Sequence, residues 1–399
     1  MIIHRDIFHF RKPDIIHKIY TGLSIVSIGV CCIMAAGCSA ANSYNKSLDK
    51  IISPYTFSTL NWESQNLFTR SVSPADTATV LSYFSQAGQI NSAATTDKSL
   101  ELELSHLSAS VEAAITQQIQ HVLTNQGLLP AHDYINLTIP PVYFHLTEAP
   151  YILAISPRDS ISLKNQIMLR NNITDQDIES VEKQVSKLNV SVEIEQLGGY
   201  GAIYPTCVSL TSSMEFTIET AVHEWVHQYL AFKPLGLRYI LDGLGINKNY
   251  DAVTINETVA GIVSQEIAAI IIQDYYPTTS SVQVAPTATA FDFNVAMQNI
   301  RRQVDTYLAA GQIDLAESYM EEQRQFLATK GYYIRKLNQA YFAFHGIYAD
   351  SPTSVDPLGD QLRQLRKNSP TLRDFLETIS DTVSRQGVVN RLSHTGVNP

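Results

Sequence analysis

Cysteine is scarce in this chain of 399 residues and is badly placed for cross-linking. Three of its four cysteines, Cys31, Cys32 and Cys38, lie within the first 38 residues. Only Cys207 remains in the part that can form a folded domain, so an internal disulfide is excluded there and the domain must be stabilised by its hydrophobic core. We interpret Cys207 as a small buried apolar residue rather than as a thiol nucleophile.

Excess positive charge is also lacking. The chain has 28 Lys and Arg residues against 38 Asp and Glu residues, a formal net charge of −10. A protein with this balance has no electrostatic reason to bind nucleic acid or anionic lipid, and we expect no nucleic-acid partner. No internal repeat is visible, which argues against a repeat architecture. The length suits one large domain or two coupled ones.

The longest uncharged apolar run, residues 19–37, follows a mildly basic segment at the amino terminus. Its length suits a secretory hydrophobic region or a short membrane span. The sequence Ala35-Ala36-Gly37-Cys38 looks like a bacterial lipobox, although Ala35 stands where leucine is usual. Two interpretations stay open: a lipoprotein anchored through lipidation of Cys38, and an uncleaved signal anchor. Both place the rest of the chain at the cell surface, with the membrane as a partner.

A pair of histidines in residues 213–233 carries the clearest chemical signal. No proline or glycine interrupts this stretch, and it contains His223-Glu224-x-x-His227. On a helix, residues four apart lie one turn above each other on the same face, so the two imidazoles can bind one zinc ion. Glu224, beside the first histidine, can then reach a metal-bound water as general base.

Catalytic zinc needs a third protein ligand, and Glu257 is the candidate. We expect it to open a second apolar helix that continues to Gln273, with Asn256 as the N-cap. Two helices with a connection of this length can pack antiparallel and bring Glu257 to the histidines. Two histidines and one glutamate leave a fourth position open for water, as catalytic rather than structural zinc requires.

The two motifs together, His223-Glu224-x-x-His227 and Asn256-Glu257-x-x-Ala260, resemble the gluzincin branch of the zincin metallopeptidases. The resemblance covers roughly residues 190–270. It implies Zn²⁺ as cofactor, Glu257 as the third ligand, and water-activated hydrolysis of peptide bonds in a peptide or protein substrate. Gly261 stands where some gluzincins carry an acidic residue that orients a zinc-bound histidine, so the orienting residue is unassigned.

The resemblance also implies where substrate binds and which group stabilises the oxyanion. In zincins an edge strand before the metal helix pairs with extended substrate. We expect a strand over residues 201–210, in which Pro205 favours an edge position, with Tyr200, Ile203 and Tyr204 as substrate-binding candidates. An edge strand that only closes the sheet is equally compatible.

Zincins usually stabilise the oxyanion with a downstream histidine or tyrosine. Our candidates are His345 and Tyr341, which share a helix face with Tyr348. An aromatic stripe of this kind is more often core packing.

We therefore expect an α+β, zincin-like fold: a small antiparallel sheet with helices, a mostly helical half, and an active-site cleft between them. The expected divisions are residues 1–38 as signal peptide or anchor, 39–54 as linker, 55–275 as the α+β part carrying the metal helices, 276–386 as the helical part, and 387–399 as a disordered tail. Two other functions stay open. One is a non-catalytic surface protein with a structural or vestigial zinc site, and the other is a zinc amidase acting on the cell envelope.

Overall fold

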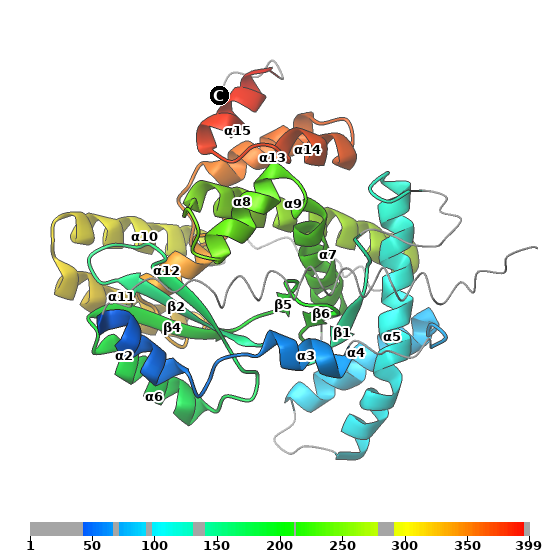
Figure 1. Ribbon diagram of the computed structural model, residues 1–399, viewed down its shortest axis with the longest axis horizontal. Helices are drawn as coiled ribbons and strands as arrows, with labels where there is room; N and C mark the ends of the chain where they lie inside the picture. Colours follow the sequence, from blue (N-terminus) through cyan, green and yellow to red (C-terminus); the bar gives the residue numbers. More distant parts are fainter. Residues whose placement is uncertain are drawn as a thin grey trace, which may run out of the picture.

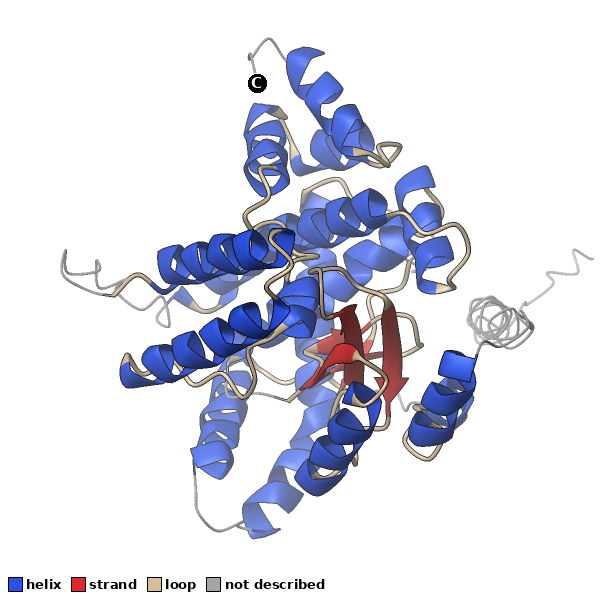
Figure 2. Ribbon diagram, turned by 90° about the vertical axis from the view of Figure 1, so that its left-hand side faces the viewer, coloured by secondary structure: helices blue, strands red, loops and turns tan. Residues whose placement is uncertain are grey.

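The computed structural model describes residues 43–66, 72–92, 98–130, 140–210, 213–277 and 291–394. The predicted anchor, residues 1–38, and its lipidation candidate Cys38 lie outside the described residues. Within the described part the chain is a mixture of many helices and a few short strands, which confirms the α+β class. The strands group in one part of the molecule, with helices around them (Figure 2).

The first sheet is antiparallel, with β2 (Tyr151–Pro157) between β3 (Asn165–Leu169) and β4 (Val190–Gln196). Because side chains alternate along a strand, β2 contributes to two cores. Leu153 and Ile155 face helices α2 (Ser43–Ile52) and α6 (Asp175–Ser186), whereas Ile152 and Ala154 pack with Phe344 of helix α12 (Gln339–His345). The sheet thus lies between helices on both faces (Figure 1).

The second sheet has the order β1-β6-β5 and is mixed. Strand β6 (Thr206–Val208) runs parallel to β1 (Phe144–Leu146) and antiparallel to β5 (Gly199–Tyr200). Our expectation of one edge strand over residues 201–210 was therefore wrong. Residues 201–205 form a turn, β6 is the central strand, and the short strand β5 is at the edge.

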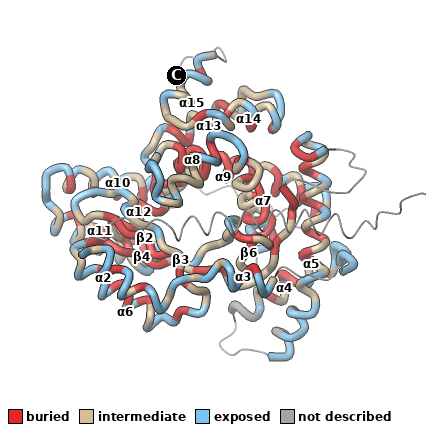
Figure 3. The backbone as a smooth tube through the Cα atoms, viewed as in Figure 1, coloured by how far each residue is buried: buried red, intermediate tan, exposed pale blue. Residues whose placement is uncertain are grey.

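The largest core is helical and is built around α7 (Met214–Leu230) and α9 (Tyr250–Tyr275). Ser213 caps α7, its hydroxyl accepting a hydrogen bond from the Phe216 N–H. Helix α9 is long and apolar enough to cross a membrane by length and composition, but 67% of its apolar window is buried inside this fold, as in a core helix. Figure 3 shows the buried residues concentrated where these helices meet their neighbours.

Helices α4 (Thr77–Ser92) and α5 (Lys98–Asn125) pack on one side of this core. The carboxyl-terminal helices α13 (Leu358–Asn368), α14 (Leu372–Ile379) and α15 (Arg385–His394) complete it. The hydrophobic core therefore extends across the division expected near residue 275. Helices α10 (Phe293–Ala309) and α11 (Ile313–Thr329) form a smaller core with α12.

Two segments expected to be unstructured are folded. The predicted linker contains α2, whose Leu48 and Ile52 are buried against α6, so this stretch belongs to the domain. The predicted tail contains most of α15, whose Val388 and Leu392 are buried in the main core. In both segments a few apolar side chains at helical spacing, among many polar ones, pack against a hydrophobic core of the domain.

Candidate metal centre

Three side chains from α7 and α9 converge in the helical core. Ligand atoms of His223, His227 and Glu257 all lie within 4.8 Å of one another. The two Nε2 atoms of the histidines are 3.1 Å apart. Glu257 Oε2 is 3.2 Å from His223 Nε2 and 3.5 Å from His227 Nε2. The packing of α9 against α7 thus brings together the three residues that the motifs predicted, which we call the metal triad.

Asn256 is inside α9 and not at its start. The helix begins at Tyr250, where Asn249 is the N-cap and accepts a hydrogen bond from the Ala252 N–H. The prediction of Asn256 as N-cap was therefore wrong. The Asn256 Oδ1 atom lies 2.6 Å from His227 Nδ1 instead. An amide oxygen only accepts, so this contact keeps the proton on Nδ1 and leaves Nε2 free to bind a metal.

Tyr239 of α8 (Pro234–Gly243) supports both Glu257 and His227, and sequence reasoning missed it. Its hydroxyl donates a 2.7 Å hydrogen bond to Glu257 Oε1. Its ring stacks on the His227 imidazole with centroids 5.0 Å apart and an interplanar angle of 3°. No motif marks this tyrosine, because its role depends on how the segment between α7 and α9 folds back over the triad.

The triad is strongly coupled electrostatically. Burial disfavours charge on Glu257 and on His227, but their mutual attraction outweighs it, which lowers the pKa of the carboxyl and raises the pKa of the imidazole. Burial beside Glu257 also raises the pKa of Tyr239 and of Tyr348, so both phenols stay protonated. Since a metal binds only neutral imidazole, metal binding at this site must release a proton.

Glu224, the predicted general base, projects from α7 towards the second sheet. Its Oε2 accepts a 2.7 Å hydrogen bond from the Gly201 N–H. The predicted substrate-binding residues lie close by on and after β5. Tyr200 and Tyr204 are half-buried, but Ile203 is only 1% exposed and packs with Cys207, so its side chain is not available to a substrate.

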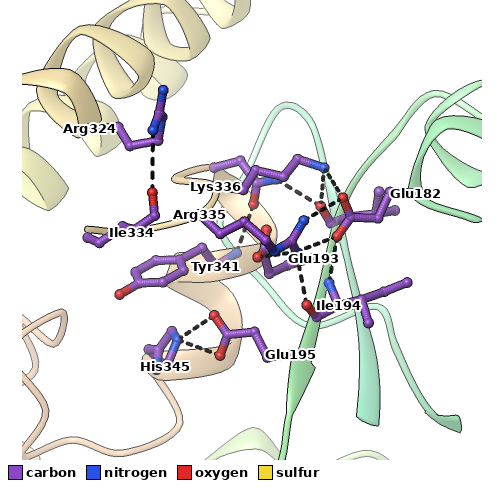
Figure 4. Close-up of polar contacts among 12 residues, drawn as sticks. Glu182, Glu193, Ile194, Glu195, Arg324, Ile334, Arg335, Lys336, Tyr341 and His345 are labelled. Atoms are coloured by element: carbon purple, nitrogen blue, oxygen red, sulfur yellow. Dashed lines mark hydrogen bonds and ion pairs between the residues drawn. The ribbon is translucent and has the colours of Figure 1, made fainter. Parts of the chain in front are cut away.

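His345 and Tyr341 face another part of the molecule. The His345 Nε2 atom lies 3.1 Å from Glu195 Oε1 on β4, and the Tyr341 ring packs against the imidazole with centroids 4.3 Å apart (Figure 4). Among the described contacts, Tyr348 is the member of this stripe that reaches the triad, with its ring 6.1 Å from that of His223. The stripe thus turns its last tyrosine, and not its histidine, towards the triad.

Arg335, which precedes α12 in the chain, pairs with the carboxylates of Glu182 on α6 and Glu193 on β4. Its Nη2 lies 2.6 Å from Glu182 Oε1 and 2.7 Å from Glu193 Oε1 (Figure 4). The basic partners lower the pKa of Glu182 against its burial, whereas burial raises the pKa of Glu193 to about 8. One carboxylate of this group therefore carries the charge and the other holds a proton.

Asp350 faces the position where the resemblance led us to look for an acidic residue. Its Oδ2 lies 3.7 Å from where a Cβ on Gly261 would be, one helical turn beyond Glu257. The side chain is 10% exposed, and its Oδ2 is 3.4 Å from Arg363 Nη2. A carboxylate from a distant part of the chain thus lies over the glycine.

Searches against protein-family models, curated proteins and solved structures returned no match to this chain.

Proposed function

We propose that the protein is a zinc-dependent hydrolase and that its substrates are peptides or proteins. The observation that carries this proposal is the geometry of the metal triad. Zinc bonded to nitrogen and oxygen at about 2.0–2.2 Å in a tetrahedron separates its ligand atoms by roughly 3.3–3.5 Å. The three separations here, 3.1, 3.2 and 3.5 Å, lie within about 0.2 Å of that range, so a small adjustment of the side chains would accommodate the ion.

The donor set favours catalysis over a purely structural site. Structural zinc is usually closed by four protein ligands, mostly cysteines, and the described residues supply three at this site, none of them cysteine. When bound, zinc would lower the pKa of a water molecule and polarise a substrate carbonyl. The chain must then supply a base, and Glu224, next to His223 on α7, is the side chain in place.

Each residue of the site has its own role in the proposed reaction. His223 and His227 present their Nε2 atoms, and Asn256 and Tyr239 hold His227 and Glu257 in position. Glu224 takes a proton from water and delivers it to the leaving amine. Tyr348, protonated and beside His223, is better placed than His345 to donate a hydrogen bond to the substrate oxygen.

The choice of a peptide bond rests on the motif resemblance and on β5. This short strand pairs with β6 on one side and is the last strand of the sheet among the described residues. The edge of a sheet is where an extended peptide can be added by backbone hydrogen bonding. A zinc amidase acting on the cell envelope would use the same triad with a differently shaped substrate, and a vestigial or structural site would bind zinc without turnover.

Zinc content and hydrolysis of the purified full-length chain test the proposal. We expect about one zinc per chain, lost in Glu257→Ala. Glu224→Gln should keep its zinc and lose hydrolysis of a mixed fluorogenic peptide library by about 100- to 10,000-fold. Wild-type protein without zinc would refute the proposal. Zinc without hydrolysis of peptides, but with release of amide-linked groups from cell-wall fragments, would favour the amidase.

A further inference from the structure

A ridge of side chains on α7 faces the glycine segment, which we define as residues 198–201 (Gly-Gly-Tyr-Gly). Phe216, Thr220, Glu224 and Gln228 recur at every fourth position and so share one face of the helix. A Cβ on Gly198 would lie 2.9 Å from Phe216 Cζ, and one on Gly199 would lie 2.6 Å from Thr220 Cγ2. The backbone of β5 therefore approaches α7 more closely than side chains would allow, as their neighbouring positions in Figure 1 suggest.

An equally close approach is at the Glu224 carboxylate. The Gly201 N–H donates to Oε2 at 2.7 Å, and a Cβ on Gly201 would lie only 2.6 Å from the same oxygen. A Cβ on Gly199 would lie 2.9 Å from Oε1. The segment thus fixes one carboxylate oxygen with a charge-assisted hydrogen bond and leaves space beside the other.

The glycine segment and the turn after it are held on two sides. From α7, Gln228 Nε2 donates to the Gly201 carbonyl at 3.1 Å and to Thr206 Oγ1 at 3.0 Å. From helix α3 (Thr59–Asn66), Trp62 Nε1 donates to the Pro205 carbonyl at 3.3 Å, and Glu63 Oε1 accepts from the Tyr204 N–H at 3.4 Å. These contacts hold the backbone against α7.

We propose that the glycine segment is a positioning element for Glu224: the Gly201 N–H holds Oε2, and the missing side chain at Gly199 leaves Oε1 as the oxygen that takes the proton from water. The inference rests on the proposed hydrolase function. A glutamate has three rotatable side-chain bonds, and holding its carboxylate in one place before substrate arrives removes the need to order it during the reaction. The contacts described above join the segment to Glu224 and its neighbours on α7, so we expect its effect to fall on the base.

Alanine substitutions in the full-length protein test the proposal. We expect Gly201→Ala and Gly199→Ala to lower kcat about 100-fold, the cost of displacing a catalytic group by about 1 Å, with KM changed less than about threefold. Zinc affinity should stay within about threefold of wild type, since the triad is untouched. Gly243→Ala is the matched control: no atom lies within 4 Å of its added Cβ, and we expect wild-type kcat.

Gln228→Leu serves as a second variant that introduces no clash with the glutamate. It removes both hydrogen bonds from Gln228 and should lower kcat about tenfold with zinc retained, even if the alanine variants fold poorly. A further readout is thermal stability. If the added methyl group at position 201 collides with the carboxylate, Gly201→Ala should lower the melting temperature less in the Glu224→Ala background than in wild type. That background removes Oε2, at 2.6 Å from the added Cβ, and keeps the Cβ of residue 224 at 2.9 Å.

The outcomes separate the two proposals. An active wild type whose glycine and Gln228 variants keep its kcat would overturn the positioning role and leave the hydrolase standing. Loss of zinc in the glycine variants along with activity would also overturn it, since the segment would then support α7 as a whole. A zinc-loaded wild type that hydrolyses nothing would refute the hydrolase, and with it the role of the segment.

Discussion

Replacing Asn256 with leucine should weaken zinc binding while leaving all three ligands in place. In the wild type, Asn256 Oδ1 lies 2.6 Å from His227 Nδ1, and Asn256 is completely buried. Without the amide oxygen, the imidazolium of the metal-free protein can lose its Nδ1 proton and keep the Nε2 proton, which Glu257 accepts. Zinc must take Nε2, which returns the proton to Nδ1 with leucine in front of it. The penalty therefore falls on the zinc-bound form.

A buried N–H without a partner costs about 1–3 kcal/mol. At about 1.4 kcal/mol for each tenfold change, this corresponds to a zinc affinity roughly 5- to 150-fold weaker. Loss of a residue that orients a metal-bound histidine typically costs about 10- to 100-fold, which agrees with this range.

The assay is competition for zinc between the protein and a chromophoric chelator. Asn256→Asp is the control, because it keeps an acceptor in the same place and should bind zinc at least as tightly as wild type. Melting temperatures of the metal-free variants show whether each is folded. A folded Asn256→Leu protein with a Kd within threefold of wild type would refute the reasoning, and the contact would then have no part in metal binding.

Three further predictions concern other parts of the molecule. Tyr239→Phe keeps the ring stacked on His227 but removes the hydrogen bond to Glu257, so zinc affinity in the chelator assay should fall about 2- to 12-fold; an unchanged Kd would contradict this. Burial raises the pKa of Glu193 to about 8 from 4.5, so the folded chain retains a proton that the unfolded chain has lost, and stability should decrease as pH rises through this window. Between pH 6 and pH 8.5, urea denaturation should show a loss of stability about 2 kcal/mol larger in wild type than in Glu193→Gln, whereas equal pH profiles would exclude Glu193 as a source. Leu392→Ala in α15 should lower the free energy of unfolding by about 2–5 kcal/mol, against no change if these residues formed a disordered tail.

Sequence reasoning succeeded where the chemistry is local. The spacing of His223 and His227 places both on one face of any helix that contains them. No proline or glycine occurs between the N-cap and the C-cap of α7. Glu257 was identified from its motif, and the connection between the two helices is long enough for α9 to pack along α7.

Predictions from local patterns were wrong where contacts with distant parts of the chain determine the structure. Asn256 was assigned as a cap because asparagine favours that position, but α9 begins at Tyr250 and the amide meets His227 instead. The strand before α7 was placed at an edge because of Pro205, yet β1 pairs with β6 on its other side. Helix α15 was missed because its few apolar residues are stable only on the core that α13 and α14 share.

The sequence by itself determined the candidate ligands, the proposed base and the lack of a disulfide among the described residues, since these depend on residue type and on spacing along the chain. Only the tertiary structure decided what holds them. Tyr239, Asn256 and the glycine segment reach the site from different elements, and their contacts exist only once α7, α8, α9 and the second sheet have packed together. Spacing along a chain sets which side chains share a helix face, whereas packing between elements sets which of them meet.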